Sequence, residues 1–437
     1  MRDVKIVVGA SFGDEGKGLM TDYFAADAMK RGKTALVVCS NGGAQRGHTV
    51  KLKCAEENAY VANITPEIRH VFHHFGSGTF VGAATYLPRF FIVNPMLFVN
   101  EYLELSDKLE AFRGCEMCDA YTQDFPKVYI HPQCFISTPY DMILNQILEE
   151  SRGNARHGSC GMGIWETLVR SGKCYDEVLQ MKDEQIFEYI IKDCKNHLWK
   201  RLQEKGITKI RDEWREIIDD EGIVEHYIQD FRFMNSVCET IDVDIFEEYD
   251  RIIFENGQGL LLDRCRREYG NNTTPSNTGF RNPAALLREY DCWKKEQETA
   301  WIDNKRLGQD KSRNDSNKAD GLINVEVCYV SRTYLTRHGA GRFDEQCDKS
   351  EINPDMVDMT NVPNPHQGTM RYGKLDEKAL IRRIREDFDS ERLPERYRAK
   401  RKLAVTHINE YTNDIIKKAD YISDGETRIT ITLTTQK

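Results

Sequence analysis

The chain has 437 residues and carries 61 Lys plus Arg against 70 Asp plus Glu, which gives a formal net charge of -9. This acidic balance excludes a general electrostatic reason to bind nucleic acid, so we expect no nucleic acid partner. No apolar run approaches the about 18 residues that cross a bilayer, and the first residues predict a strand instead of a signal peptide, so we expect a cytoplasmic protein with no membrane partner.

Two short β-branched runs near the start of the chain, residues 4–10 and 34–40, flank a segment whose apolar spacing suits a helix that ends at Gly32. A strand, loop, helix and strand in this order predict a parallel sheet. Further strand patterns occur at residues 251–256, 323–330 and 402–409. We predict an α/β fold, with one large domain over residues 1–437 around a mainly parallel sheet.

Two long polar stretches interrupt these patterns. Residues 176–250 have a helical period and much charge, which predicts a helical cover with a solvated face. Residues 287–320 are strongly polar and contain few core-forming side chains after Trp301. We expect a surface insertion there.

The thirteen cysteines stand singly, apart from Cys115 and Cys118. An odd total argues against a complete disulfide framework, and no second close pair completes a zinc site. We expect ordinary reduced thiols.

The loop "SFGDEGKG", residues 11–18, looks like a phosphate loop but matches neither common pattern. It lacks the first glycine and the final hydroxyl of the GxxxxGK[ST] loop, and its glycines run in the reverse spacing of GxGxxG. What remains is a glycine-rich turn in which Gly13, Gly16, Gly18 and Lys17 can meet an anion at a helix N-terminus. Asp14 would repel such a ligand unless it binds a metal or takes a proton. The alternative is a capped turn with solvated charges.

A second glycine-rich loop, "SNGGAQRGHTV", follows the second predicted strand. His48 could donate to a phosphate oxygen, with Thr49 beside it. A single loop histidine is also common as a structural residue, so both interpretations stand.

Taken together, the strand, "GDEGKG", helix, strand and "GHT" resemble adenylosuccinate synthetase. The resemblance continues through "HGSCGMGIWETLVRSG", "FENGQGLLLD", "TTPSNTG", "YLTRHGAGRF", "QGTMRYGKLD", "LAVTHINEY" and "SDGETR". The helical stretch and the polar insertion carry little of it.

The resemblance implies a ligase that joins aspartate to a purine nucleotide in two steps. Asp14 would take the N1 proton of the purine, so that the C6 oxygen attacks the γ-phosphoryl group of a nucleoside triphosphate. Lys17 and His48 would stabilise the transferring group, and Mg²⁺ would be held by Asp14 and the carbonyl oxygen of Gly47. The amine of L-aspartate then displaces the new phosphate.

Binding residues follow from the same resemblance. Arg170 would reach the monophosphate across a homodimer interface, although a structural surface arginine is an equal alternative. The family's GTTGRG loop is "GSCGMG" here, and Gln45 stands where an asparagine is usual. Thr369 and Arg371 would bind aspartate, with Arg337 at the floor of the site. The purine monophosphate would be held by Gln45, Ser159, Cys160, Arg170, Gln258 and Thr274.

The donor base pocket departs from the family, which reads guanine with a Thr-Lys-x-Asp motif. Here the stretch is Thr406-His407-Ile408-Asn409, and Ser423 and Gly425 match the other wall. An amide both donates and accepts, so Asn409 can pair with adenine, and we predict ATP or dATP as donor.

The acceptor stays open between IMP or dIMP and GMP or dGMP. The phage aminoadenylosuccinate synthetases have a similar change to asparagine and act on dGMP, but many lack the acid that this chain keeps at Asp14. Two other functions are considered: a catalytically idle nucleotide-binding protein on the same fold, and a phosphotransferase that stops at the C6 phosphate.

Overall fold

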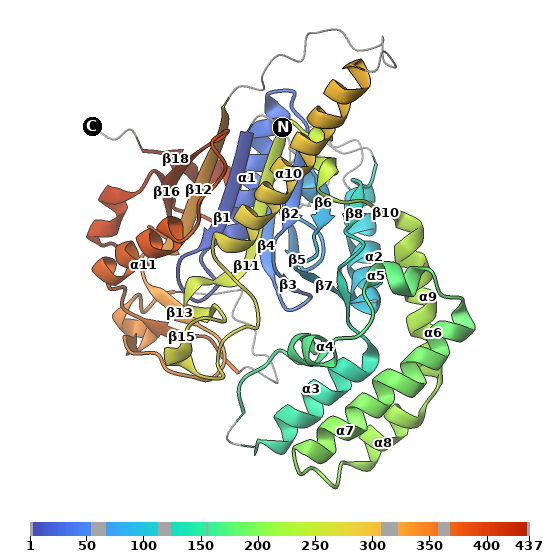
Figure 1. The fold of residues 1–437 in the computed structure, drawn as a ribbon. Helices are drawn as coiled ribbons and strands as arrows, with labels where there is room; N and C mark the ends of the chain where they lie inside the picture. Colours follow the sequence, from blue (N-terminus) through green and yellow to red (C-terminus); the bar gives the residue numbers. More distant parts are fainter. Residues whose placement is uncertain are drawn as a thin grey trace.

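A ten-stranded sheet forms the centre of the computed structural model (Figure 1). The structure describes residues 3–53, 67–111, 124–153, 156–306, 322–356 and 368–434. Neighbouring strands are parallel except for the final pair, β17 and β18, so the predicted mainly parallel α/β sheet is confirmed. In spatial order the strands are β10 (Cys238–Thr240), β8 (Val128–Ile130), β6 (Ala84–Leu87), β2 (Ala35–Cys39), β11 (Arg251–Gly259), β1 (Asp3–Gly9), β12 (Ile323–Arg332), β16 (Tyr397–Thr406), β17 (Tyr421–Ser423) and β18 (Ile431–Leu433).

Strand β1 lies in the middle of the sheet, between β11 and β12. Val4, Ile6 and Val8 are fully buried on one face and Val7 on the other. A strand that is covered on both faces needs a continuous apolar run, which is why the sequence pattern at residues 4–10 was so clear. Helix α1 (Lys17–Lys30) follows at once and leads to β2.

The bounds predicted for strand β16 differ from those in the structure. The apolar run predicted a strand at residues 402–409, but β16 begins at Tyr397 and ends at Thr406. Its polar first half, residues 397–401, pairs with Ile323–Val327 of β12. Pairing with a neighbouring strand therefore overrides a composition that is unfavourable for a strand.

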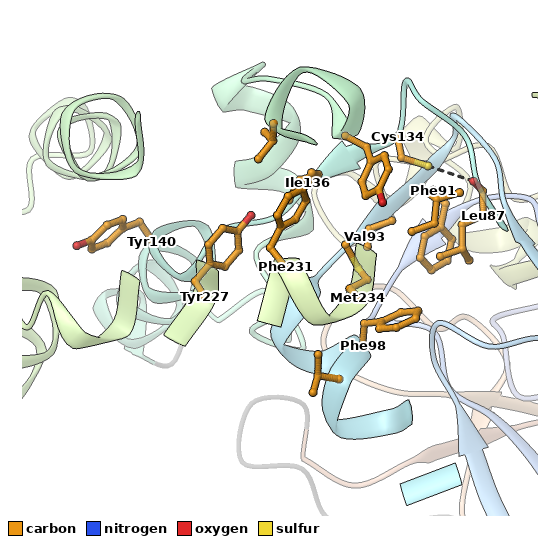
Figure 2. Close-up of a cluster of buried hydrophobic side chains, with 14 of the residues drawn as sticks. Leu87, Phe91, Val93, Phe98, Cys134, Ile136, Tyr140, Tyr227, Phe231 and Met234 are labelled. Atoms are coloured by element: carbon orange, nitrogen blue, oxygen red, sulfur yellow. Dashed lines mark hydrogen bonds between the residues drawn. The ribbon is translucent and has the colours of Figure 1, made fainter. Parts of the chain in front are cut away.

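A group of helices lies to one side of the sheet, beyond β8 and β10 (Figure 1). Figure 2 shows Phe231 and Met234 of α9 beside Val93 and Ile136, within one buried apolar cluster. Cys134 in this cluster donates to the carbonyl oxygen of Leu87 over 3.2 Å. Helices occupy most of the stretch for which we predicted a helical cover. The group comprises α2 (Pro95–Ala111), α3 (Pro139–Ser151), α4 (Ile164–Arg170), α5 (Tyr175–Leu179), α6 (Asp183–Tyr189), the π-helix η4 (Ile190–Lys195), α7 (Asn196–Glu204), α8 (Asp212–Asp219) and α9 (Gly222–Val237).

The polar stretch at residues 287–320 is corrected in its first part. Residues up to Arg306 belong to helix α10 (Arg281–Arg306), whose Leu286, Leu287 and Tyr290 are buried against the sheet. A helix needs one apolar face only, so its polar remainder was mistaken for an insertion. Residues 307–321 lie outside the described residues, as do Cys115 and Cys118.

Short strands that form smaller sheets, together with short helices, lie in the segments that connect the strands of the central sheet. Helix α11 (Glu377–Asp389) packs on the sheet near β12 and β16. None of the described helices is long and apolar enough to cross a membrane. The small sheets are β13 (Leu335–Arg337) with β15 (Arg371–Gly373) and β14 (Gln346–Cys347), β3 (Gly42–Gly43) with β7 (Phe91–Val93) and β9 (Phe135–Ile136), and β4 (His48–Lys53) with β5 (Glu67–Phe72); the 3-10 helices are Thr79–Val81, Val243–Glu248, Leu260–Leu262, Arg267–Tyr269, Lys349–Glu351, Asp414–Lys418 and Arg428–Thr430.

Candidate active site

The loop between β1 and α1 is built to receive an anion. Gly16 precedes the helix with φ +95°, a left-handed conformation that lets the chain turn sharply into Lys17. The first turn of α1 contains no acidic residue, so its free N–H groups are not neutralised. A Cβ atom on Gly18 would lie 3.0 Å from the Cβ atom of His48, which brings the second glycine-rich loop against this helix end.

Glu15 holds this loop together, and the sequence analysis missed it. Its carboxylate is almost fully buried and accepts hydrogen bonds from the backbone N–H groups of Ser11, over 2.9 Å, and Gly13, over 2.8 Å. The ammonium group of Lys17 lies 3.0 Å from the same carboxylate and also donates to the carbonyl oxygen of Gly13. Glu15 is adjacent to Asp14 in the same loop, so the argument that singled out an acid beside a phosphate site applies to both residues.

Asp14 has a different environment from its neighbour. Its side chain is 32% exposed, and its Oδ2 atom lies 3.4 Å from Nε2 of His338. Its backbone carbonyl oxygen accepts a hydrogen bond from the buried Arg332, which fixes the main chain but not the carboxylate. Asp14 is thus the acid of this loop that a ligand can reach.

His48 belongs to a buried charge cluster centred on Glu255, the fifth residue of β11. Nδ1 of His48 lies 2.7 Å from one carboxylate oxygen of Glu255, and the guanidinium of Arg46 lies 2.6 Å from the other. The backbone N–H and hydroxyl of Ser77 also donate to Glu255. Because the carboxylate accepts, the Nδ1 atom of His48 donates, and Nε2 is left for another partner.

The charges in this cluster set its protonation. Burial opposes ionisation of Glu255, but Arg46, His48 and Ser77 outweigh it and keep the pKa of the carboxyl below its ordinary value. Burial lowers the pKa of His48 from 6.5 to about 4, against the pull of Glu255. The resting state is therefore an ionised Glu255 with a neutral His48.

This pKa shift predicts acid sensitivity. The unfolded chain takes up a proton at His48 near pH 6.5 and the folded chain near pH 4, so the free energy of unfolding falls as the pH drops through this window. Between pH 7 and pH 5 we expect a loss of about 2 kcal/mol. His48→Gln keeps an N–H donor for Glu255 and should flatten the dependence. Urea unfolding midpoints at both pH values measure it, and an equal slope in the variant would assign the effect elsewhere.

Two glutamine amides meet beside the phosphate loop. Gln258 has φ +56°, an uncommon conformation for this residue type, and its backbone lies against Gly13. A Cβ atom on Gly42 would lie 3.2 Å from the amide nitrogen of Gln45 and 3.4 Å from the amide oxygen of Gln258. Both amide atoms of Gln45 are buried without a hydrogen-bond partner among the described residues. Such atoms favour a polar ligand at this position.

The loop at residues 156–163 packs against the loop after β13. Ser159 donates its hydroxyl to Asn145 over 2.8 Å, and burial raises the pKa of Cys160 to about 11, so this thiol stays neutral. A Cβ atom on Gly158 would lie 2.8 Å from the backbone of Gly339, which joins this loop to the one after β13. Thr274 is half-buried in a third loop, where its N–H donates to the carbonyl oxygen of Leu262.

Arg170 is engaged within its own chain. Its guanidinium binds both carboxylate oxygens of Asp141 over 2.9 Å, the hydroxyl of Tyr189 over 2.6 Å and the carbonyl oxygen of Ile136 over 2.8 Å. The side chain is 5% exposed. In this conformation the Arg170 guanidinium is used inside its own chain, and because the side chain is buried it is not the surface arginine of the second interpretation.

Two arginines stand side by side in the small sheet. Arg337 of β13 pairs with Arg371 of β15, and neither forms an ion pair with an acid among the described residues. Burial, with Arg371 adjacent, lowers the pKa of Arg337 to about 10, and burial also lowers the pKa of Arg371. Thr369 is exposed nearby in the sequence. Two adjacent guanidinium groups without an acid suit a dicarboxylate.

The two segments predicted to bind the donor base are neighbours. The N–H of Ile408 donates to the carbonyl oxygen of Ser423, whose hydroxyl donates to the carbonyl oxygen of Gly425 over 3.0 Å. His407 has φ +58°, and Asn409 beyond it is exposed. Burial, then the charge of Arg332, lowers the pKa of His407 well below its ordinary value.

This base loop is connected to the phosphate loop. The hydroxyl of Thr406 donates to the carbonyl oxygen of Glu15 over 2.8 Å, and a Cβ atom on Gly16 would lie 3.2 Å from the methyl group of Thr406. The carboxyl ends of β1, β11 and β16 therefore bring the predicted phosphate, acceptor and donor residues to one edge of the sheet, as open α/β sheets do.

The residues at this edge fit Mg²⁺ bound together with phosphate. The described residues contain no cluster of three or more metal-binding side chains, so they form no complete protein cage. Mg²⁺ usually takes one or two carboxylates and completes its shell with substrate phosphates and water. The Asp14 carboxylate is 32% exposed and Gly47 is exposed, so both are accessible for that arrangement.

Comparison with known proteins decides the family. Residues 6–286 match the family model described as adenylosuccinate synthetase, which is more than half of the chain. The chain belongs to the adenylosuccinate synthetase family.

The adenylosuccinate synthetase of Clostridium kluyveri is 27% identical over 266 residues, which are 59% of this chain and 53% of that protein. The enzyme of Limosilactobacillus fermentum is 23% identical over 384 residues, 86% of this chain and 72% of that protein. The alignments with several adenylosuccinate synthetases span a little over half of their length.

Solved structures of adenylosuccinate synthetase type share the fold. The fully ligated adenylosuccinate synthetase of Plasmodium falciparum has a TM-score of 0.62 and 15% identity, and the match covers 99% of this chain and 100% of that one. The succinoaminodeoxyadenylate synthetase of cyanophage S-2L, bound to dGMP and to dATP as an energy donor, has a TM-score of 0.56 and 12% identity, over 100% of this chain and 97% of that one.

Proposed function

We propose that this protein is a purine nucleotide:L-aspartate ligase, in which a nucleoside triphosphate phosphorylates the purine C6 oxygen before the amine of aspartate displaces the phosphate. One observation carries the proposal: Asp14 is accessible on a phosphate loop whose other acid, Glu15, is fully committed to holding that loop. An acid that is accessible beside a phosphate site is suited to take a proton from the substrate.

The other residues have roles that match this chemistry. The N-terminus of α1 with Lys17 would bind the transferring phosphoryl group, assisted by Gly13, Gly16, Gly18 and Thr49. With Nδ1 of the neutral His48 donating to Glu255, Nε2 is an acceptor, and it would donate to a phosphate oxygen once it has taken up a proton. Mg²⁺ held by Asp14 and the carbonyl oxygen of Gly47 would supply charge neutralisation of the phosphates.

The acceptor and aspartate sites complete the pocket. The unpaired amide of Gln45 and the adjacent Gln258 would bind the purine monophosphate with Ser159, Cys160 and Thr274. Arg371, beside Arg337, would bind the carboxylates of aspartate with Thr369. We do not assign Arg170 to the monophosphate of another subunit while its donors are used by Asp141, Tyr189 and Ile136.

We also propose ATP or dATP as the donor, bound by His407, Asn409, Ser423 and Gly425. The amide of Asn409 can both donate to and accept from adenine, whereas guanine selection calls for a carboxylate. The cyanophage S-2L protein, solved with dATP as an energy donor, indicates that an adenine nucleotide suits this fold.

Asn409→Asp tests the donor assignment. The carboxylate accepts hydrogens only, so we expect the ratio of kcat/KM for ATP to that for GTP to fall by roughly tenfold. Asn409→Ala is the control, because it should weaken both donors without favouring GTP. A wild-type protein that turns over only with GTP would contradict the assignment.

A homodimer in the cytoplasm is the proposed setting, in line with the family. Trp165 and Val169 lie one turn apart on α4 and are 55% and 36% exposed, which is compatible with a contact between subunits. Light scattering of the purified protein would measure the oligomeric state.

A substrate matrix tests the function as a whole. Purified protein with Mg²⁺ is combined with ATP or GTP, each of the four purine monophosphates, and aspartate, and products are identified by mass. We expect a succinyl-purine nucleotide that needs all three substrates. A donor diphosphate and a C6-phosphorylated purine nucleotide formed without aspartate would indicate a phosphotransferase, and nucleotide binding without turnover would indicate the idle binding protein. The retained Asp14, Lys17 and His48 argue against that alternative.

A further inference from the structure

Residues 332–334, at the carboxyl end of β12, lie between two loops of the candidate site. In the central sheet β12 stands between β1, which leads into the Asp14 loop, and β16, which leads into the turn at residues 407–410. The main chain of Arg332 pairs with Thr406, the last residue of β16. Side chains at this end of β12 can therefore contact both loops.

Arg332 begins a chain of hydrogen bonds that joins Asp14 to this turn. It is buried, donates through Nε to the carbonyl oxygen of Asp14, and donates through Nη1 to the hydroxyl oxygen of Tyr334 over 2.8 Å. The hydroxyl of Tyr334 donates in turn to the carboxylate of Glu410. Arginine has donors only, so the tyrosine oxygen accepts from it and its one hydrogen goes to the carboxylate. Burial raises the pKa of Tyr334, so this hydroxyl keeps its hydrogen.

The turn at residues 407–410 contains Asn409, the residue proposed to pair with the donor base. The N–H of Glu410 donates to the carbonyl oxygen of His407 over 3.1 Å, which closes the turn and leaves Asn409 exposed. The hydroxyl of Thr333 donates to the same carbonyl oxygen over 3.3 Å. The turn and the end of β12 are therefore joined by two hydrogen bonds, one on each side of Asn409.

The Asp14 carboxylate depends on its main chain for its position. Its side chain is 32% exposed, and its ionic neighbour among the described residues, His338, is 3.4 Å away. Glu15 holds the N–H group of Gly13, one residue earlier, and Arg332 holds the carbonyl oxygen of Asp14 itself. The direction of the Asp14 side chain is therefore set by how firmly Arg332 is held.

We infer that Tyr334 is a positioning residue for the Asp14 base, and that it ties this base to the turn that contains Asn409. The inference rests on the proposed function, because it takes the role of base from Asp14. A guanidinium that loses the tyrosine oxygen can turn toward another acceptor, and the hold of Arg332 on the Asp14 carbonyl then weakens. Proton transfer needs heavy atoms about 2.6–3.2 Å apart, so a small displacement of the base lowers kcat more than it raises KM.

Tyr334→Phe tests this role, because it removes the hydroxyl and retains the ring that lies against Tyr372 and His407. We expect kcat to fall by about tenfold, with changes of less than about twofold in the KM values for donor, acceptor and aspartate. Glu410→Gln keeps an acceptor oxygen for Tyr334 and should retain most of the wild-type kcat. Glu410→Ala removes the acceptor and should resemble Tyr334→Phe.

The Asp14→Asn background shows whether Tyr334 acts through Asp14. In that background Tyr334→Phe should leave the single-turnover rate unchanged, because no base remains to be positioned. A residue that only supports the fold would lower the rate again by a similar factor. Tyr421→Phe is the matched control, since Tyr421 is also buried and donates to Glu326 of β12 over 2.7 Å. We expect the wild-type kcat from this control.

Three results would overturn the inference: wild-type kcat from Tyr334→Phe, wild-type kcat from Glu410→Ala, or a loss from Tyr334→Phe that persists in the Asp14→Asn background. The Glu410 variants change a half-buried turn and test the same chain of hydrogen bonds if Tyr334→Phe does not fold. Failure of the proposed function has a different signature, which is wild-type kcat from Asp14→Asn alone. An inactive Asp14→Asn beside a fully active Tyr334→Phe would contradict this inference only.

Discussion

Replacement of Asp14 by asparagine is expected to lower kcat by roughly a thousandfold. The amide cannot take the N1 proton, so the C6 oxygen stays a poor nucleophile toward the triphosphate. Nucleotide binding should persist, because Glu15 and Arg332 hold the loop and neither depends on the Asp14 side chain. Single-turnover kinetics and calorimetry on the same preparation separate these two effects.

The matched control is Asp219→Asn at the end of α8, where the carboxylate is 61% exposed and pairs with Lys195. We expect wild-type kcat from this variant. An Asp14→Asn protein with unchanged kcat would remove Asp14 from the role of base. A variant that no longer binds nucleotide would show that the carboxylate serves binding instead.

Replacement of Glu255 by glutamine should have the largest effect on stability, a loss of about 3 kcal/mol or more in the free energy of unfolding. The variant leaves the buried guanidinium of Arg46 without its counter-charge. The amide has a single acceptor oxygen in place of the two that Arg46 and His48 use, so His48 is oriented less firmly and we expect kcat to fall by roughly a hundredfold. Urea unfolding and steady-state kinetics measure the two losses.

Glu239→Gln serves as the control for Glu255. Glu239 lies on the edge strand β10, is 59% exposed, and pairs with Lys127 at 3.3 Å. Exposed ion pairs contribute about 0–1 kcal/mol, so this change should be nearly silent. If Glu255→Gln were equally silent, the buried cluster would not be what holds His48 in place.

Much of the central sheet could be predicted because its strands are covered on both faces. From Val4 to Gly9 strand β1 contains one polar side chain, Lys5, and that pattern stands out in one sequence. The first half of β16 and the polar part of α10 were missed for the opposite reason. The first half of β16 pairs with β12, and the polar part of α10 continues a helix whose Leu287 and Tyr290 are buried in the core.

The candidate site also contains some residues that the sequence could predict and others that it could not. Asp14, Lys17 and His48 stand in loops whose glycines mark them as unusual. Glu15 and Glu255 look like ordinary charged residues, and only the folded chain reveals that backbone N–H groups, Arg46 and His48 converge on them. Sequence spacing shows which residues can meet, but the partners of a buried charge depend on tertiary contacts.

The fate of the C6 oxygen tests the central claim most directly. The acceptor monophosphate is prepared with ¹⁸O at C6 and converted with donor, aspartate and Mg²⁺, and the inorganic phosphate is analysed by mass spectrometry. If the C6 oxygen attacks the γ-phosphoryl group, the label leaves with that group and appears in the phosphate. Unlabelled phosphate, formed together with the aspartate adduct, would show that the purine oxygen is never phosphorylated and would contradict the account.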